Sequence, residues 1–468
     1  MRYWKNRAIL AAAGLCLMLA AATSEPGLQM QPEIAKYRKV ARQLLESGLW
    51  EQYTYSLLGA ITSSGPRMAG STGAADAVEL TRRIMQELGF EAVHLEPTQV
   101  PHWVRGPDAT ARMISSQGVI SPLTVAAIGG SIATPESGIS GPVLEVRSFE
   151  ELRYKREHAA GRIVFFNRPM DPAQLNTFSA YAGAADQRTQ GAVEGARAGA
   201  KAVLVRSLTM RIDDSPHTGM MRYAPGIRQI PAACISTLDA EWLHRRLLED
   251  PDTQVEMRLR CRNLEPVLSH NVVGQITGHE KPDEIVLLGG HLDCWDLGQG
   301  AHDDGAGCAQ AIAAVRLLQK LGLAPRRTIR AVMFMNEEFG GSGGRDYASS
   351  KLRDGETHLA ALESDRGGFL PLAIGIGLGP EEFEGFRKWE ALFRSIGLQR
   401  LQRGGGGVDI GPLGARGTIL CGLVPDSQRY FDVHHSAKDV IEAVNSRELE
   451  LGTIAMALWA YIVAEEGF

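Results

Sequence analysis

The residues of this sequence that are best suited to chemistry are acids and histidines in short motifs of its second half. They are His291-Leu292-Asp293, Asp303-Asp304-Gly305, Glu337-Glu338, Asp365 and His435. Imidazole nitrogens and carboxylate oxygens without cysteine form a ligand set that suits zinc, and manganese or cobalt can use the same donors. Each motif alone is common, but the ordered combination predicts a metal-dependent site.

The first two motifs indicate how such a site is built. His291 and Asp293 lie two residues apart after an apolar run, so they share a face of a strand. The carboxylate can then accept a hydrogen bond from the imidazole, which orients a ligating histidine. The adjacent acids Asp303 and Asp304 repel each other unless a cation is near. Taken singly, the motifs have ordinary alternatives: a surface histidine, and an aspartate that caps a helix.

The paired glutamates suit proton transfer. Glu337 and Glu338 follow an apolar run that ends at Met335. One carboxylate can therefore bind metal while the other moves a proton, although a solvated turn is the alternative for this motif alone. Arg366, beside Asp365, either balances the charge of that acid, as arginines near acids usually do, or contacts a substrate carboxylate.

Strands that alternate with helices must position these motifs. After residue 271, apolar runs predict strands at 285–288, 328–335, 359–362 and 418–423, and helices at 305–321, 381–396 and 446–465. This alternation is typical of a mostly parallel sheet covered on both faces, a three-layer αβα sandwich. Ligands in such sheets collect at the carboxyl ends of the strands, where the motifs lie.

The first 24 residues have the pattern of a secretory signal peptide. Basic residues at positions 2, 5 and 7 precede an apolar run from Ala8 to Ala22, and small and polar residues follow it. The run is short for a membrane span, so an uncleaved anchor is the less favoured alternative. We therefore expect a secreted or periplasmic protein.

The rest of the chain is long enough for two folded units or for one unit with a large insertion. The texture changes between residues 118 and 261, where short β-branched runs are separated by loops. We interpret 118–261 as an inserted β-rich domain without chemistry of its own. Residues 25–117 and 262–468 then form the first and second parts of the main domain.

Composition narrows the partners. The formal net charge is -5 and no lysine- or arginine-rich block occurs, so nucleic acid is not an expected partner. No later apolar run reaches the length of a membrane span, so we expect no span in the mature chain. The remaining cysteines include no close pair that would indicate a disulfide framework. Small molecules or peptides remain as substrates.

Longer matches around the motifs resemble a known family. They are the stretch from His291 to Asp296, the stretch from Gly298 to Gly305, Glu337-Glu338, Glu363-Ser364-Asp365, the glycine run Gly404 to Gly407, and His435-Ser436. This set resembles the zinc exopeptidases of the carboxypeptidase Q family, also called plasma glutamate carboxypeptidases. Secreted leucyl aminopeptidases and glutamate carboxypeptidase are wider relatives. The middle region resembles a protease-associated domain.

The resemblance implies a site with two zinc ions per chain. By position, His291 and Asp365 hold one ion, Glu338 and His435 hold the other, and Asp303 bridges them.

The resemblance also implies roles for two further acids. Glu337 is the general base, and Asp293 orients His291 as its hydrogen-bonding partner. His302, His434 and Asp304 do not match ligands and are expected to be neighbours of the site.

The function that follows from the resemblance is a secreted di-zinc exopeptidase that hydrolyses dipeptides or short peptides near a terminus. Close relatives are often homodimers. An aminopeptidase with the same zinc site is the alternative. The two differ in the group that fixes the substrate terminus, and Asp409 is a candidate for that group. A related deacylase class is disfavoured by the insertion and by Glu363-Ser364-Asp365. A binding protein that has lost catalysis, as in transferrin receptors, is disfavoured because every expected ligand and Glu337 are present.

Overall fold

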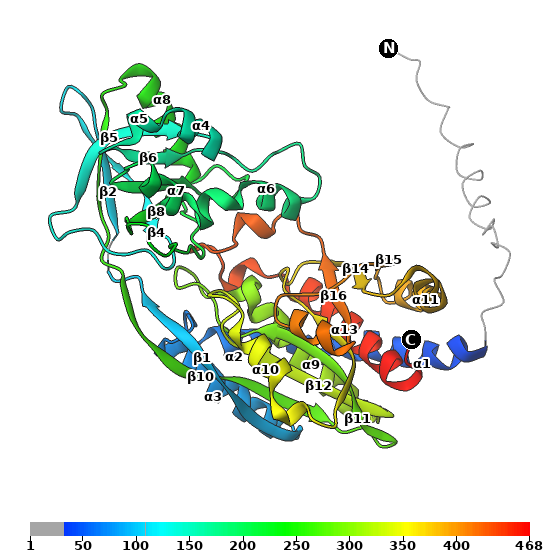
Figure 1. Cartoon of the computed structure of the whole chain (residues 1–468). Helices are drawn as coiled ribbons and strands as arrows, with labels where there is room; N and C mark the ends of the chain where they lie inside the picture. The colour runs from blue at the N-terminus through cyan, green and yellow to red at the C-terminus, as the bar shows by residue number, and fades with distance from the viewer. Residues whose placement is uncertain (1–31, 108) are drawn as a thin grey trace, which may run out of the picture.

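The structure is a computed structural model that describes residues 32–107 and 109–468, so the predicted signal peptide lies outside the described residues. Two eight-stranded sheets occupy different parts of the molecule (Figure 1). None of the helices in the described residues is long and apolar enough to cross a membrane.

The first sheet carries the predicted strands. Its order is β1 (Glu91–Val104), β10 (Arg262–Ile276), β12 (Arg327–Phe334), β11 (Lys281–His291), β13 (Thr357–Glu363), β16 (Ile419–Pro425), β14 (Pro371–Ile376) and β15 (Arg400–Arg403). The four central strands β12, β11, β13 and β16 run parallel. Toward one edge β10 and β1 pair antiparallel, and toward the other edge β14 pairs antiparallel with β16 and parallel with β15. The α/β class and the parallel centre predicted from the sequence are confirmed.

Helices cover both faces of this sheet, and one layer is much thicker. On one face the core joins α1 (Pro32–Glu51), α2 (Tyr53–Thr62), α3 (Thr72–Glu87), α9 (Ala306–Lys320) and α13 (Ser446–Glu466). The alanine-rich faces of α9 and α13 contact each other, because small side chains let two helices approach closely. The other face is covered by the short helix α10 (Ser342–Ser349) and by a 3₁₀ segment at Gly411–Arg416.

The helix predicted at 381–396 is wrong as a single element. It divides into α11 (Pro380–Phe386), a 3₁₀ turn (Arg387–Trp389) and α12 (Glu390–Arg394). Buried side chains recur every three residues through the break, at positions 383, 386, 389 and 392, and positions 393 and 396 are buried after it. A 3₁₀ turn has three residues per turn, so tightening the helix keeps these apolar side chains on one face.

The second sheet draws its strands from residues 110–258. Its order is β3 (Ile120–Leu123), β2 (Thr110–Ile114), β9 (Gln254–Arg258), β5 (Ile139–Val146), β6 (Ile163–Phe166), β7 (Ala202–Arg206), β8 (Ala232–Ile235) and β4 (Val125–Ala127). The helices of the same region are α4 (Phe149–Tyr154), α5 (Arg156–Ala159), α6 (Thr177–Thr189), α7 (Gly191–Arg197) and α8 (Thr237–Glu249). We propose that this region is the inserted unit. Its strand β2 lies before residue 118, so the proposed unit begins earlier in the chain than the boundary predicted from the sequence.

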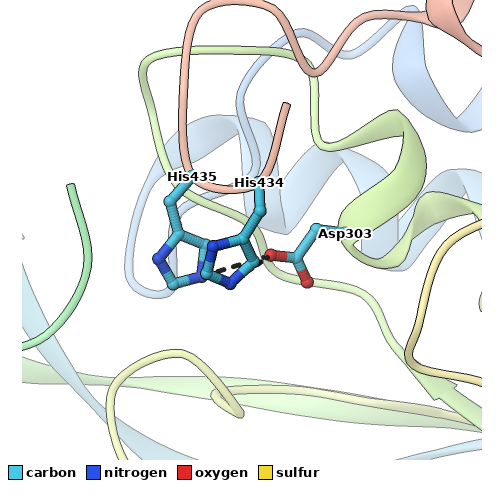
Figure 2. A group of neighbouring side chains, drawn as sticks. All are labelled: Asp303, His434 and His435. Carbon is cyan, nitrogen blue, oxygen red and sulfur yellow. Dashed lines mark ion pairs between the residues drawn. The ribbon is translucent and has the colours of Figure 1, made fainter. Parts of the chain in front are cut away.

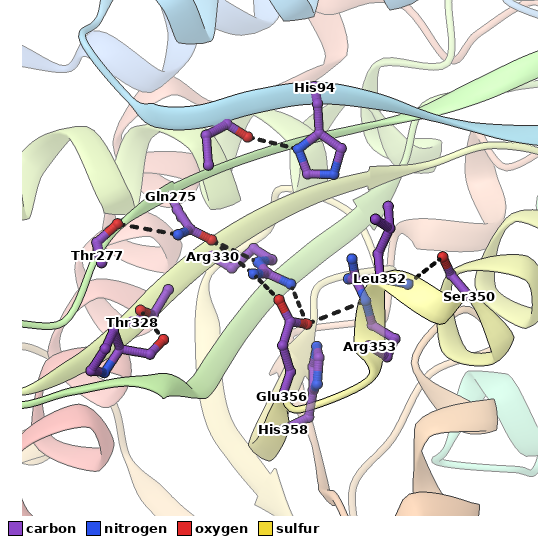
Figure 3. Close-up of polar contacts among 12 residues, drawn as sticks. His94, Gln275, Thr277, Thr328, Arg330, Ser350, Leu352, Arg353, Glu356 and His358 are labelled. Carbon is purple, nitrogen blue, oxygen red and sulfur yellow. Dashed lines mark hydrogen bonds and ion pairs between the residues drawn. The ribbon is translucent and has the colours of Figure 1, made fainter.

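A buried network of ion pairs ties the edge of the first sheet to its centre. Arg353 donates to Glu96 of β1 at 2.7 Å, and its guanidinium lies 4.2 Å from the ring centroid of Tyr347. Glu356 lies 3.2 Å from Arg353 and 2.7 Å from Arg330 of β12, and Figure 3 shows both of these contacts. Arg353 is 1% exposed, so its charge depends on these partners rather than on water.

We expect Arg353→Met to destabilise the protein by about 3 kcal/mol, because it removes the buried guanidinium from Glu96 and leaves that carboxylate with His94 as its ion-pair partner. The measurement is the shift of the urea or thermal unfolding midpoint. Arg387→Met is the matched control, because its ion pair with Glu384 is exposed at both ends and should contribute less than about 1 kcal/mol. Equal shifts for the two variants would show that burial of the network does not matter.

Candidate active site

The chemistry-bearing motifs lie at the carboxyl ends of the central strands. His291 is the last residue of β11, and Asp303 lies in the tight turn Ala301–Gly305 that leads into α9. Glu338 follows β12 and Asp365 follows β13, while His435 lies in the long connection after β16. Parallel strands end at one edge of a sheet, so side chains distant in sequence meet there.

One group forms around His291. Its Nε2 lies 3.3 Å from Oδ1 of Asp303 and 3.4 Å from Oδ1 of Asp365. One donor atom from each of the three lies within 4.8 Å of the others, which is close enough for all three to contact a single cation.

A second group forms around His435. Its Nε2 lies 3.2 Å from Oδ2 of Asp303 and 3.1 Å from Oε2 of Glu338. Asp303 therefore faces both groups, one carboxylate oxygen toward each histidine. All five predicted ligands converge in one place.

His434 lies nearer to this second group than the sequence indicated. Its Nε2 is 3.6 Å from Oδ2 of Asp303, and its ring stacks on that of His435 with centroids 3.5 Å apart. Figure 2 shows both imidazoles side by side and facing Asp303. Asp303, His434 and His435 thus form a further set of donors that could hold a cation. By contrast, His302 stacks on Phe369, away from these donors.

The predicted hydrogen bond between His291 and the carboxylate of Asp293 is wrong, because His291 contacts the backbone of Asp293 instead. The Nδ1 of His291 lies 2.9 Å from the backbone carbonyl oxygen of Asp293, while the carboxylate is 3.9 Å away. That carboxylate accepts the backbone N–H groups of Asn336 and Glu337 at 2.6 and 3.1 Å. Residue 293 therefore orients the imidazole through its carbonyl and the Glu337 segment through its side chain.

The region of the second sheet, which we propose to be the inserted unit, contacts the second group directly. The Nδ1 of His435 lies 3.2 Å from the carbonyl oxygen of Thr218, and the N–H of Thr218 donates to the carbonyl oxygen of His435 at 2.9 Å. With Nδ1 bonded in this way, Nε2 remains for a cation. His435 adopts a left-handed backbone with φ of 58°, which is uncommon for a residue with a side chain.

Two more supports were not predicted from the sequence. Trp295 donates its indole N–H to Glu338, and the carboxylate of Asp439 accepts the backbone N–H groups of His302 and Asp303 at 2.7 and 3.1 Å. Trp295 lies within the motif that begins at His291, and Asp439 lies shortly after His435. Closeness to these motifs was the only feature of the sequence that pointed to the two residues. Both carboxylate oxygens of Asp409 are buried and receive no hydrogen bond from the described residues, and its role at a substrate terminus stays a prediction.

Burial and crowding shift the pKa values of the acids. Burial raises the pKa of Glu337 well above its usual range, and the charges of Asp365 and Glu338 add to the shift. Burial also raises the pKa of Glu338, against the opposing effect of His435. These carboxylates are costly to ionise together in a site that holds no cation.

The pKa values of the histidines respond to the acids. Burial alone would lower the pKa of His291, but Asp365 and Asp303 outweigh it and raise that pKa well above the ordinary value.

Burial lowers the pKa of His434, and the charge of His435 lowers it further, which keeps His434 neutral.

The donor atoms fit a metal ion. Oε1 of Glu338 is buried and receives no hydrogen bond from the described residues, although a buried carboxylate oxygen normally has a partner. A cation beside Glu338 would satisfy that oxygen. The set of two or three imidazoles with carboxylates, and no thiolate, is one that zinc uses.

Comparisons with known proteins agree with this site. The model of peptidase family M28 matches residues 271–458. Human carboxypeptidase Q is 33% identical over 448 residues, covering 93% of this chain and 91% of that protein, and the bovine protein is also 33% identical with the same coverage of both.

Solved structures show the same fold. An M28 peptidase precursor from Shewanella amazonensis has a TM-score of 0.87 at 33% identity, over 93% of this chain and 98% of that chain. A zinc aminopeptidase from Bacillus subtilis has a TM-score of 0.62 at 20% identity, over 89% and 95% of the two chains.

A mixed sheet with histidines and acids gathered at the ends of its parallel strands defines a metallohydrolase, and the relatives narrow this class to zinc-dependent exopeptidases. The chain belongs to peptidase family M28, and its sequence similarity to carboxypeptidase Q extends over almost its whole length.

Proposed function

We propose that this protein is an exported di-zinc exopeptidase that hydrolyses dipeptides or short peptides at a terminus, as the name of its carboxypeptidase Q relatives suggests. The observation that carries the proposal is the position of Asp303, whose two carboxylate oxygens face His291 and His435. In this proposal His291 and Asp365 bind one zinc, Glu338 and His435 bind the other, and Asp303 bridges them.

Charge balance supports two cations rather than one. The three acidic candidate ligands and Glu337 bring four carboxylates into one buried region. Asp293 and Asp304 are further buried acids beside these four, so two divalent ions would offset more of the negative charge than one.

The protein side chains have separate tasks in the proposed reaction. Zinc, when bound, supplies Lewis acidity toward the peptide carbonyl and toward water. Glu337 accepts a proton from water and delivers it to the leaving amine nitrogen. Asp293 holds the backbone N–H of Glu337 and thereby fixes the base, while Thr218 and Trp295 hold His435 and Glu338.

Metal analysis tests the two-zinc proposal. We expect purified protein to contain two zinc ions per chain, to lose hydrolysis of free dipeptides after chelation, and to recover it when zinc is restored. Hydrolysis that persists in the fully chelated protein would contradict the proposal. If the active protein contained a single zinc per chain, the proposal of a second zinc ion would be wrong.

The substrate terminus is tested by comparing free dipeptides with aminoacyl arylamides. Preferred cleavage of the dipeptides supports an enzyme of the carboxypeptidase Q type, and preferred cleavage of the arylamides supports the aminopeptidase alternative. We also propose that residues 1–24 direct export. An N-terminal sequence of the secreted protein that begins near residue 25 would support this role, and retention inside the cell would contradict it.

A further inference from the structure

A cavity of about 620 Å³ opens beside Asp365. This volume lies in the range of pockets that hold small ligands. Its lining includes Asp365 and Arg366 after β13, Arg403 at the end of β15, the glycine run Gly404–Gly407, and Phe178 of α6. The candidate zinc site and the cavity thus share Asp365, so a peptide held at the zinc site can extend into this space.

Two arginines in the cavity have no acidic partner. Within residues 32–107 and 109–468, neither Arg366 nor Arg403 forms an ion pair, although Asp365 is the chain neighbour of one of them. The guanidinium of Arg366 instead lies 4.9 Å from the ring centroid of Phe178. The sequence favoured simple charge balance with Asp365, but the structure contains no ion pair between them.

Phe178 gives Arg366 a fixed place. Its ring stacks on Tyr430 with centroids 5.3 Å apart and meets Phe431 edge-on at 5.0 Å. A guanidinium over an aromatic face keeps its N–H groups at the edge free to donate, because the ring occupies only its flat face. The proposed inserted unit therefore contributes Phe178 to the wall of the cavity, and this ring positions the guanidinium of Arg366.

The glycine run leaves part of the cavity wall without side chains. A Cβ at position 407 would lie 2.0 Å from the carboxyl carbon of Glu363, and one at position 405 would lie 2.5 Å from the carbonyl oxygen of Gly375. Glu363 also lines the cavity, but among the described residues it forms no ion pair with either arginine, and its Oε2 accepts the N–H groups of Asp409 and Ile410.

We propose that Arg366 and Arg403 bind a carboxylate of the peptide substrate in this cavity. The inference rests on the proposed function, because it places the scissile bond at the zinc site next to Asp365. Planar guanidinium groups recognise carboxylates through paired hydrogen bonds, and two unpaired ones at the wall of a pocket favour an anionic group there. The carboxylate belongs either to the peptide C-terminus or to an acidic side chain.

The test measures kcat and KM of the zinc-loaded protein and of Arg366→Gln, Arg403→Gln and the double variant. Ala-Leu against Ala-Leu-NH2 isolates the terminal carboxylate. Ala-Glu-NH2 against Ala-Gln-NH2, and Glu-Ala-NH2 against Gln-Ala-NH2, isolate an acidic side chain on either side of the bond. Arg394→Gln is the control, because Arg394 is exposed, pairs with Glu390 and lies outside the cavity.

We expect each single variant to raise KM for the preferred carboxylate substrate about tenfold, with kcat little changed. The matched uncharged substrate and the control variant should show no such rise. The peptide pair in which the charged member is preferred identifies the carboxylate that the arginines bind.

Two failures are distinguishable. Equal cleavage of charged and uncharged partners, with variants unchanged, overturns the arginine proposal and leaves the exopeptidase intact. If the zinc-loaded protein cleaves none of these peptides, the proposed function fails and the arginine proposal fails with it.

Discussion

Glu337→Gln should lower kcat for dipeptide hydrolysis by about 10³-fold while zinc content stays unchanged. The amide has the size of the carboxylate but cannot take a proton from water. Neither donor group around Asp303 needs Glu337, since His291 and Asp365 form one and Glu338 and His435 form the other.

Two measurements decide this prediction: steady-state hydrolysis and metal content of the same preparation. Glu249→Gln is the control, because that glutamate is exposed at the end of α8 in the region of the second sheet. Near-normal turnover in Glu337→Gln would remove this residue from the base role. Loss of both zinc and activity would indicate that Glu337 is a zinc ligand.

Asp303→Asn should weaken binding of both zinc ions, by more than about 100-fold, and reduce hydrolysis to background. The neutral amide removes the charge that faces both His291 and His435 and offers only one oxygen. In contrast, Asp365→Asn touches one group only, so we expect it to weaken one ion more than the other.

Zinc titration with a competing chelator measures both affinities. Asp283→Asn serves as the control, because Asp283 lies exposed near the opposite end of the same strand, β11. If Asp303→Asn retained two tightly bound ions, the bridging role would be wrong. If only one ion were weakened, Asp303 would belong to a single site.

The sequence was sufficient to predict the central part of the fold. Apolar runs of strand length alternate with helical patterns after residue 271. The parallel strands β11, β12, β13 and β16 lie at the positions that these runs predict. Element ends were less predictable. The break in 381–396 depends on which apolar side chains reach the core, and local periodicity does not reveal that.

The sequence by itself determined the donor types and their places at strand ends, because hydrophobic periodicity and the order of motifs are local properties. Only the tertiary structure decided how the donors are supported and which space lies beside them. His435 meets the carbonyl oxygen of Thr218 across 217 positions of the chain, and Arg366 lies over Phe178 of another unit. Such contacts depend on the way in which the long loops and the proposed inserted unit pack against the sheet. No pattern of neighbouring residues in the sequence predicts that packing.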